Sequence, residues 1–178
     1  RQVPIHHGEV GLCATGSGGS GHRDANARVF IAIFANVMQR ILILNGPNLN
    51  LLGSRETEVY GARSFETYFE ELRTKFPSIV LEYSQSNLEG ELIDAIQRAD
   101  GRVKGVVLNA GGFTHTSVAL RDAIAAVKVP VVEVHISNLL ARESFRHTSI
   151  TGGVCIGSIM GLGLDGYRLA ISHLLQRD

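Results

Sequence analysis

Three short segments of the sequence are rich in side chains that can move protons or bind hydroxyl groups. They cover residues 45–60, 109–117 and 133–147, and each begins at the end of an apolar run. The chemically capable side chains in them are Asn48, Arg55, Tyr60, Asn109, His115, Glu133, His135, Ser137, Arg142, Arg146 and His147. This set favours proton transfer next to a carbonyl group. One group removes a proton, neutral donors stabilise the enolate, and a histidine protonates the leaving oxygen.

Tyr60 and Arg55 share a segment bounded by Gly53 and Gly61. A tyrosine is a poor base at its reference pKa of about 10, but a nearby guanidinium stabilises the phenolate and lowers that pKa. A glycine-bounded loop can also close over a substrate and exclude water. The pair is therefore a candidate general base, although the spacing alone also fits an aromatic side chain packed on the surface of a loop.

The other candidates also have ordinary structural explanations. Glu133 and His135 point to the same side of one predicted strand, so they fit a buried structural pair. Further explanations of this kind are a strand-ending turn for residues 45–48, a helix cap at His115, and a solvated helical face for Arg142 and Arg146. Because all these groups fall at one edge of the predicted sheet, a shared site accounts for them better than a set of separate structural roles.

Several other chemistries lack their characteristic residues. The sequence has no metal-ligand spacing, no Ser-His-Asp order typical of hydrolases, and no Gly-rich loop ending in Lys-Ser or Lys-Thr. Lys75, Lys104 and Lys128 fall on or between predicted helices, which argues against a Schiff base. Residues 161–166 fit G-x-G-x-x-G, but the chain is too short after them for the acidic ribose partner of a dinucleotide fold. Close helix packing explains these glycines better, and we expect neither a metal nor a cofactor.

Short apolar runs and helical patterns alternate along the chain and must position these residues. Strands are predicted at residues 41–44, 79–83, 106–108, 131–136 and 154–159. Helices are predicted after Ser64, after Asn87, around residues 120–127 and around residues 167–174, with Ser64 and Asn87 as N-caps. This order indicates an α/β, flavodoxin-like fold with a five-stranded parallel sheet, strand order 2-1-3-4-5, and helices on both faces. Ligands bind beyond the carboxyl ends of such strands, where the polar segments fall.

Charge and composition argue against several other classes of protein. Seventeen basic residues balance seventeen acidic ones, so no overall field favours nucleic acid or an anionic membrane. The apolar stretch 29–38 is far shorter than the about 20 residues that cross a bilayer. Cys13 and Cys155 form neither a disulfide framework nor a zinc site, which favours a cytoplasmic protein, with Cys155 as a small buried hydrophobe.

The first 38 residues differ from the rest of the chain. Residues 15–22 read TGSGGSGH, a composition typical of flexible coil, and no periodic apolar face precedes Val29. We therefore expect residues 1–38 to be a non-catalytic head, disordered or appended upstream of a natural start at Met38. Residues 39–178 then form one catalytic domain. The alternative is a genuine extension that covers an edge of that domain.

Seven segments, taken together, resemble type II 3-dehydroquinate dehydratase. They are NGPNLNLLG (45–53), SRETEVYG (54–61), QSNLEGELID (85–94), LNAGGFTHTSVALRDA (108–123), VEVHISN (132–138), ARESFRH (141–147) and GLGLDGYRLAI (161–171). They keep the order and spacing of that family from about Arg40 to the C-terminus, whereas residues 1–38 have no counterpart in it.

The resemblance implies a reaction and a role for each matching residue. The reaction is a metal-free anti elimination of water from 3-dehydroquinate, which gives 3-dehydroshikimate through an enolate. Tyr60, aided by Arg55, would remove the C2 proton, and His135, oriented by Glu133, would protonate the departing C1 hydroxyl. The other implied roles are a water on the enolate oxygen held by Asn48, substrate hydroxyls held by Asn109, His115 and Arg146, the carboxylate held by the backbone at Ile136 and Ser137, and Asp122 reaching into a neighbouring subunit. The resemblance also implies a homododecamer of four trimers.

Two other classes share this fold and are weighed against an enzyme. A flavodoxin-like domain can be a flavin carrier or a phosphorylated receiver module without its own catalysis. A receiver needs an acidic cluster at the ends of its first and third strands, where this chain has Asn45 and Asn109. A flavin carrier would be expected to have aromatic side chains flanking the flavin, and the chain contains no Trp.

Overall fold

The computed structural model describes residues 38–53 and 64–177 of the chain. Their secondary structure begins with β1 (Arg40–Asn45), followed by a 3-10 turn η1 (Leu49–Leu51) and helix α3 (Phe65–Lys75). Next come β2 (Val80–Gln85), α4 (Glu89–Ala99), β3 (Gly105–Asn109), the 3-10 helix η2 (Gly111–His115), α5 (Val118–Ala126) and β4 (Val131–His135). The 3-10 turns η3 (Leu139–Ala141), η4 (Ser144–Arg146) and η5 (Gly152–Val154) lead to β5 (Gly157–Met160) and α6 (Asp165–Gln176).

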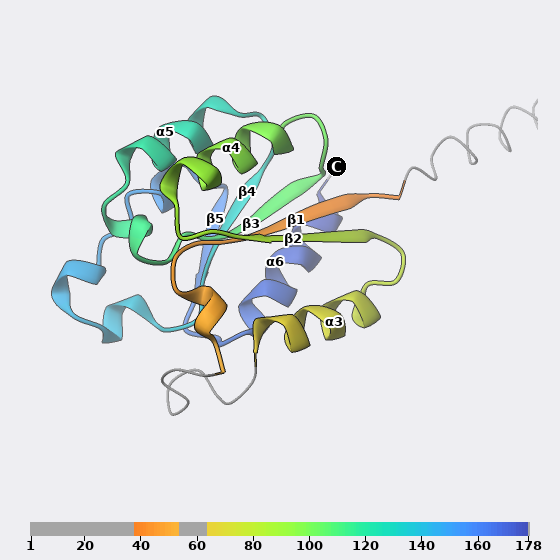
Figure 1. The fold of residues 1–178 in the computed structure, drawn as a ribbon, viewed down its shortest axis with the longest axis horizontal. Helices are drawn as coiled ribbons and strands as arrows, with labels where there is room; N and C mark the ends of the chain where they lie inside the picture. The colour runs from red at the N-terminus through yellow and green to blue at the C-terminus, as the bar shows by residue number, and fades with distance from the viewer. Residues whose placement is uncertain (1–37, 54–63, 178) are drawn as a thin grey trace, which may run out of the picture. The chain divides into compact units, whose positions relative to one another are not determined.

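The strands form one parallel sheet in the order β2-β1-β3-β4-β5 (Figure 1). Helices α4 and α5 cover one face of this sheet, and α3 and α6 cover the other (Figure 1). The predicted flavodoxin-like architecture and its strand order are therefore confirmed. Connections between parallel strands must cross over the sheet, and the helices in those crossovers bury both of its faces.

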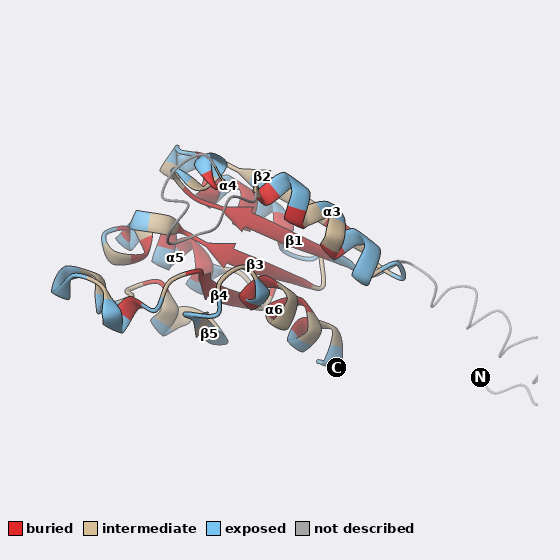
Figure 2. Ribbon diagram, turned by 90° about the horizontal axis from the view of Figure 1, so that it is seen from below, coloured by how far each residue is buried: buried red, intermediate tan, exposed pale blue. Residues whose placement is uncertain are grey.

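Two apolar clusters hold the layers together, one on each face of the sheet. The first joins β1, β3 and β4 to α3 and α6, and the second joins the same strands to α4 and α5. The central strands are buried on both faces, which explains why their sequences are continuous apolar runs rather than alternating ones (Figure 2). None of the helices in the described ranges has the length and apolar character needed to span a bilayer.

One predicted helix cap is confirmed and the other is wrong. The hydroxyl of Ser64 accepts a hydrogen bond from the backbone N–H of Thr67 at the start of α3, as the sequence predicts. Asn87 does not cap α4. The N-cap residue of α4 is Leu88, and no side chain caps the helix; the hydroxyl of Ser86 accepts from the backbone N–H of Leu88, at 2.9 Å. The side chain of Asn87 contacts the turn after β1.

The fifth strand begins later than predicted. The sequence places it at residues 154–159, whereas residues 152–154 form the turn η5 and the strand starts at Gly157. Val154 and Cys155 pack against the apolar cluster beside α4 and α5, so this part of the apolar run is buried without being extended. Cys155 is half-buried, and burial, with a further contribution from the charge of Glu133, raises the pKa of its thiol to about 12.

The glycines of the G-x-G-x-x-G match serve the turn into the last helix. Gly161 and Gly163 have φ values of 81° and 60°, which side chains other than glycine rarely adopt. Gly166 lies against Val134 and Ile159, where an added Cβ would approach Val134 to 3.1 Å. Close helix packing thus explains Gly166, and the chain direction at the turn explains the other two.

Candidate active site

A cavity of about 260 Å³ opens at the carboxyl edge of the sheet. It is lined by side chains from the turn after β1, from η2 and from the segment after β4. The predicted site residues among its lining are Asn48, Asn109, His115, His135, Ile136, Ser137 and Arg146. Residues that are far apart in the sequence therefore share one concave site, because the strands that carry them are neighbours and run in the same direction.

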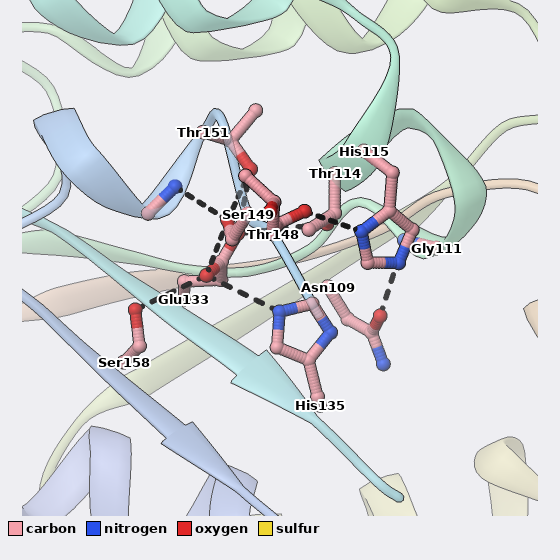
Figure 3. A network of polar contacts seen from close by, with 11 residues as sticks. Asn109, Gly111, Thr114, His115, Glu133, His135, Thr148, Ser149, Thr151 and Ser158 are labelled. Atoms are coloured by element: carbon pink, nitrogen blue, oxygen red, sulfur yellow. Dashed lines mark hydrogen bonds and ion pairs between the residues drawn. The ribbon is translucent and has the colours of Figure 1, made fainter. Parts of the chain in front are cut away.

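Glu133 lies behind this cavity and is almost fully enclosed, with 1 % of its surface exposed. Its carboxylate accepts hydrogen bonds from Thr151 at 2.6 Å, from Ser149 at 2.9 Å and from Ser158 at 3.1 Å (Figure 3). The hydroxyl of Thr114 lies at the edge of this group, 3.5 Å away. A buried carboxylate needs such donors, because the cost of removing it from water is otherwise severe.

The charge of Glu133 is stabilised by these neighbours. Burial raises the pKa of the Glu133 carboxyl, but His135 and the hydroxyls of Thr151 and Ser149 outweigh burial and hold that pKa at about 2. Gly152 completes the enclosure. A Cβ at this position would lie 2.6 Å from the Oε2 atom of Glu133, so a larger residue would displace the carboxylate.

His135 lies between Glu133 and the cavity. Its Nε2 atom lies 3.2 Å from Oε2 of Glu133, a charge contact without an aligned hydrogen bond. The other ring nitrogen, Nδ1, is turned toward the side of Asn109 and His115 (Figure 3). The two residues do form a buried pair, and because His135 also lines the cavity, the pair is placed to transfer a proton to a ligand.

His115 lies across the cavity in a defined tautomer. Its Nδ1 atom is 2.7 Å from the backbone carbonyl of Thr148 (Figure 3). Since a carbonyl can only accept, Nδ1 carries the proton and Nε2 is left for a ligand. The backbone N–H of Ile150 also donates to the carbonyl of Thr114, at 3.0 Å, so η2 is bound to the segment that carries the hydroxyls around Glu133.

Asn48 contributes to the cavity from a tight turn after β1. It is the one residue other than glycine in the described ranges with a positive φ, at 66°. Its backbone N–H donates to Oδ1 of Asn87, at 3.0 Å. Asparagine tolerates this left-handed conformation better than most residues, and the contact from Asn87 holds the turn in place.

Two arginines approach the cavity from the segment after β4. Arg142 donates to the hydroxyl of Ser137 at 3.2 Å, and Arg146 donates to Glu143 at 3.0 Å. Both arginines line the cavity, and because Arg142 follows η3 and Arg146 ends the three-residue turn η4, they do not share the face of one solvated helix. They give the opening a positive charge that suits an anionic ligand.

The described residues do not place every predicted site residue at the cavity. Arg55 and Tyr60 fall outside the described residues. Asp122 does not line the cavity of its own chain. Its exposed side chain forms an ion pair with Arg121 at 2.9 Å. In the described part of the chain, no three His, Cys, Asp or Glu side chains form a group that could hold a metal ion.

Sequence patterns do not reveal the hydroxyls around Glu133. Thr114, Ser149, Thr151 and Ser158 come from three separate segments and share no spacing. The only signal for part of this group is the polar run at residues 147–152 between two predicted strands, which is equally typical of an ordinary loop.

Comparison with known proteins gives one consistent result. The family described as Dehydroquinase class II matches residues 39–175. The 3-dehydroquinate dehydratase of Bacillus cytotoxicus is 51 % identical over 142 residues, which cover 79 % of this chain and 97 % of the relative. That of an Exiguobacterium species is 56 % identical over 138 residues, covering 77 % and 94 %. The crystal structure of type II dehydroquinase from Butyrivibrio crossotus superposes with a TM-score of 0.75 at 46 % identity, covering 78 % of this chain and 99 % of the other.

Proposed function

The chain belongs to the class II dehydroquinase family, and from this membership we infer that it is a hydro-lyase that converts 3-dehydroquinate into 3-dehydroshikimate and water. The structural observation that supports this inference is the composition of the cavity. A histidine backed by a buried carboxylate lies opposite amide and imidazole groups suited to hydroxyls, with arginines at the opening. A flavin carrier or a receiver module has no use for such an acid and its orienting carboxylate.

His135 acts as the general acid in this proposal. The C1 hydroxyl is a poor leaving group, and a proton delivered to its oxygen allows it to depart as water. Glu133 is held ionised in its shell of hydroxyls, and its charge lies 3.2 Å from Nε2 of His135. The carboxylate therefore stabilises the protonated imidazole and keeps Nδ1 directed at the cavity.

Tyr60 acts as the base and Arg55 supports its phenolate, as the family resemblance implies. Removal of the C2 proton places negative charge on the C3 carbonyl oxygen, and Asn48 holds a water molecule that stabilises this enolate. The role of Asn48 is supported by the turn after β1, which brings this residue to the cavity in a constrained conformation. Electrons of the broken C–H bond end in the C1–C2 double bond as water leaves.

The substrate is bound by groups on three sides of the cavity. Asn109, His115 and Arg146 hold its hydroxyls, and the backbone at Ile136 and Ser137 takes its carboxylate. Asp122 serves the site of a neighbouring subunit, and the subunits assemble into a dodecamer of four trimers. Asp122 is exposed and lies outside the cavity of its own chain, which leaves its side chain accessible to a neighbouring subunit.

The test is an assay with 3-dehydroquinate that follows the ultraviolet absorbance of the conjugated enone product. A purified chain that gives no enone would refute the proposed activity. Hydrogen exchange at C2 in D₂O then separates the two proton transfers. Tyr60→Phe should lower kcat by a factor on the order of 10² to 10⁴ and abolish exchange. His135→Asn should lower net dehydration but retain exchange. Exchange at the wild-type rate in Tyr60→Phe would mean that another group is the base.

A further inference from the structure

A chain of three polar side chains lies beneath the cavity, on the face of the sheet that α6 covers. Asn45 and Asn109 are the last residues of β1 and β3 and are partners in the sheet register. Tyr167 comes from the first turn of α6. Its hydroxyl donates to Oδ1 of Asn45 at 2.9 Å and accepts from Nδ2 of Asn109 at 2.9 Å. Tyr167 and Asn45 are fully buried, and Asn109 is 4 % exposed.

These contacts determine which way the Asn109 amide faces. The backbone N–H of Gly111 approaches the Asn109 side chain at 3.2 Å, and because an N–H can only donate, the atom that it meets is Oδ1. Nδ2 is then the atom that faces Tyr167. The Tyr167 oxygen accepts from Nδ2 and directs its single proton to Asn45. None of these three side chains can exchange its donor and acceptor atoms unless the other two do so as well.

The Asn109 amide still has hydrogen-bonding sites that these contacts do not use. One N–H of Nδ2 and one lone pair of Oδ1 are not used by the contacts with Tyr167 and Gly111. Since Asn109 lines the cavity, these two sites are available to a ligand. A hydroxyl group can use both, because it accepts through its oxygen and donates through its proton. Burial also raises the pKa of Tyr167, so its phenol stays protonated and remains a donor to Asn45.

We propose that Tyr167 is a positioning residue that orients the Asn109 amide to bind a substrate hydroxyl. The inference rests on the proposed function, because the hydroxyl would be one of those on 3-dehydroquinate. Tyr167 does not touch the substrate and acts through Asn109. Without its hydroxyl, Nδ2 of Asn109 loses its partner and the amide can turn, so substrate binding weakens while the proton transfers remain intact.

The test is a double-mutant cycle on 3-dehydroquinate with Tyr167→Phe, Asn109→Ala and the double variant. Tyr167→Phe should raise KM about tenfold, the effect of leaving one buried donor without a partner, and should change kcat much less. In the Asn109→Ala background the same change should have no further effect on KM, because the group through which Tyr167 acts is gone. A full, additive effect in that background would overturn the proposal, as would a wild-type KM in Tyr167→Phe.

Tyr83→Phe is the matched control. The Tyr83 ring packs on Phe65 in the same aromatic cluster, with centroids 4.7 Å apart, compared with 4.9 Å for Tyr167. The buried hydroxyl of Tyr83 interacts with the side chain of Asn45, without an aligned hydrogen bond, and makes no hydrogen bond with Asn109. We expect a wild-type KM for this variant. An equal rise in KM would assign the effect to the loss of any hydroxyl from this cluster rather than to the Tyr167–Asn109 contact, and it would refute the role of Tyr167.

A second variant covers the case in which Tyr167→Phe does not fold. Asn45→Ala removes the acceptor for the Tyr167 proton, so it should raise KM by a smaller factor, and only when Asn109 is present. A wild-type KM in this folded variant would count against the proposal. Failure of the proposed function is distinguishable from failure of this inference, because the first appears as an inactive wild-type chain and the second only in the variants.

Discussion

Glu133 shows how a single residue depends on several distant ones. Its carboxyl has a pKa of about 2 in the folded chain, below the ordinary value of 4.5, because His135 and neighbouring hydroxyls outweigh the effect of burial. A group with a lowered folded-state pKa is protonated more easily in the unfolded chain. Its contribution to stability is therefore complete above about pH 4.5 and is lost as the pH falls from there toward 2.

Removing one of the hydroxyls that contact Glu133 should reveal how this carboxylate makes stability depend on pH. Thr151→Val deletes the donor at 2.6 Å and should lower the melting temperature at pH 7 by several degrees, corresponding to about 1–3 kcal/mol. Thr151→Ser keeps a hydroxyl and should lose less. The gap between Thr151→Val and the wild type should be complete above about pH 4.5 and should narrow as the pH falls toward 2, where the Glu133 carboxylate becomes protonated in the folded wild type as well. Thermal unfolding at fixed protein concentration measures this, and a gap that is as large at pH 2 as at pH 7 would contradict it.

At the scale of elements, the carboxyl end of β2 holds the turn that follows β1. Oδ1 of Asn87 accepts from the backbone N–H of Asn48 and from Nε2 of Gln85, both at 3.0 Å. Gln85 also donates to the carbonyl of Gly46 at 3.2 Å. Two polar residues at the end of one strand thus support the left-handed conformation of Asn48 at the end of its neighbour.

Substitutions at the neighbouring residues 86 and 87 can separate the support of Asn48 from the hydrogen bond at the start of α4. Asn87→Ala should lower kcat/KM about three- to tenfold, because Asn48 is less well placed, whereas Asn87→Asp keeps the acceptor oxygen and should retain most of the activity. Ser86→Ala removes the hydroxyl that accepts from the backbone N–H of Leu88 just before α4, and it should cost about 0.5–1.5 kcal/mol of stability with little change in kcat/KM. Steady-state kinetics and thermal unfolding of the three variants decide the matter. A wild-type kcat/KM in Asn87→Ala would show that the contact between Asn87 and Asn48 does not contribute to catalysis.

At the scale of the whole molecule, the family match begins at residue 39 and accounts for the chain up to residue 175. We predict that a chain starting at Met38 keeps the kcat/KM and the assembly of the full chain. The reason is that the site residues and the sheet all lie after this point, and residues 1–37 lack an apolar periodicity that could dock. Enzyme assays and light scattering of both chains test this. Precipitation or a smaller assembly of the shorter chain would show that the apolar segment 29–37 packs against the domain.

The sequence by itself determined the elements, their order and the edge at which the site lies. Apolar runs of strand length report burial on both faces of a sheet, and helical periodicity reports one buried face, so both are legible in a window of a few residues. Polar segments placed after those runs must meet at the carboxyl edge of a parallel sheet, and Asn109, His115 and His135 do. The roles of Arg55, Tyr60 and Asp122 stay predictions that come from the family resemblance.

Only the tertiary structure decided the contacts that orient these groups. Asn87 has the sequence position of a helix cap, yet the packing of β2 beside β1 directs its side chain to Asn48. The hydroxyls around Glu133 come from segments 16 to 25 positions away, and Tyr167 reaches Asn109 across 58 positions. Periodicity records whether a side chain is buried, but it does not record which partner lies opposite. That partner is set by the register of neighbouring strands and by the way α6 packs on the sheet, which arise only when distant segments come together.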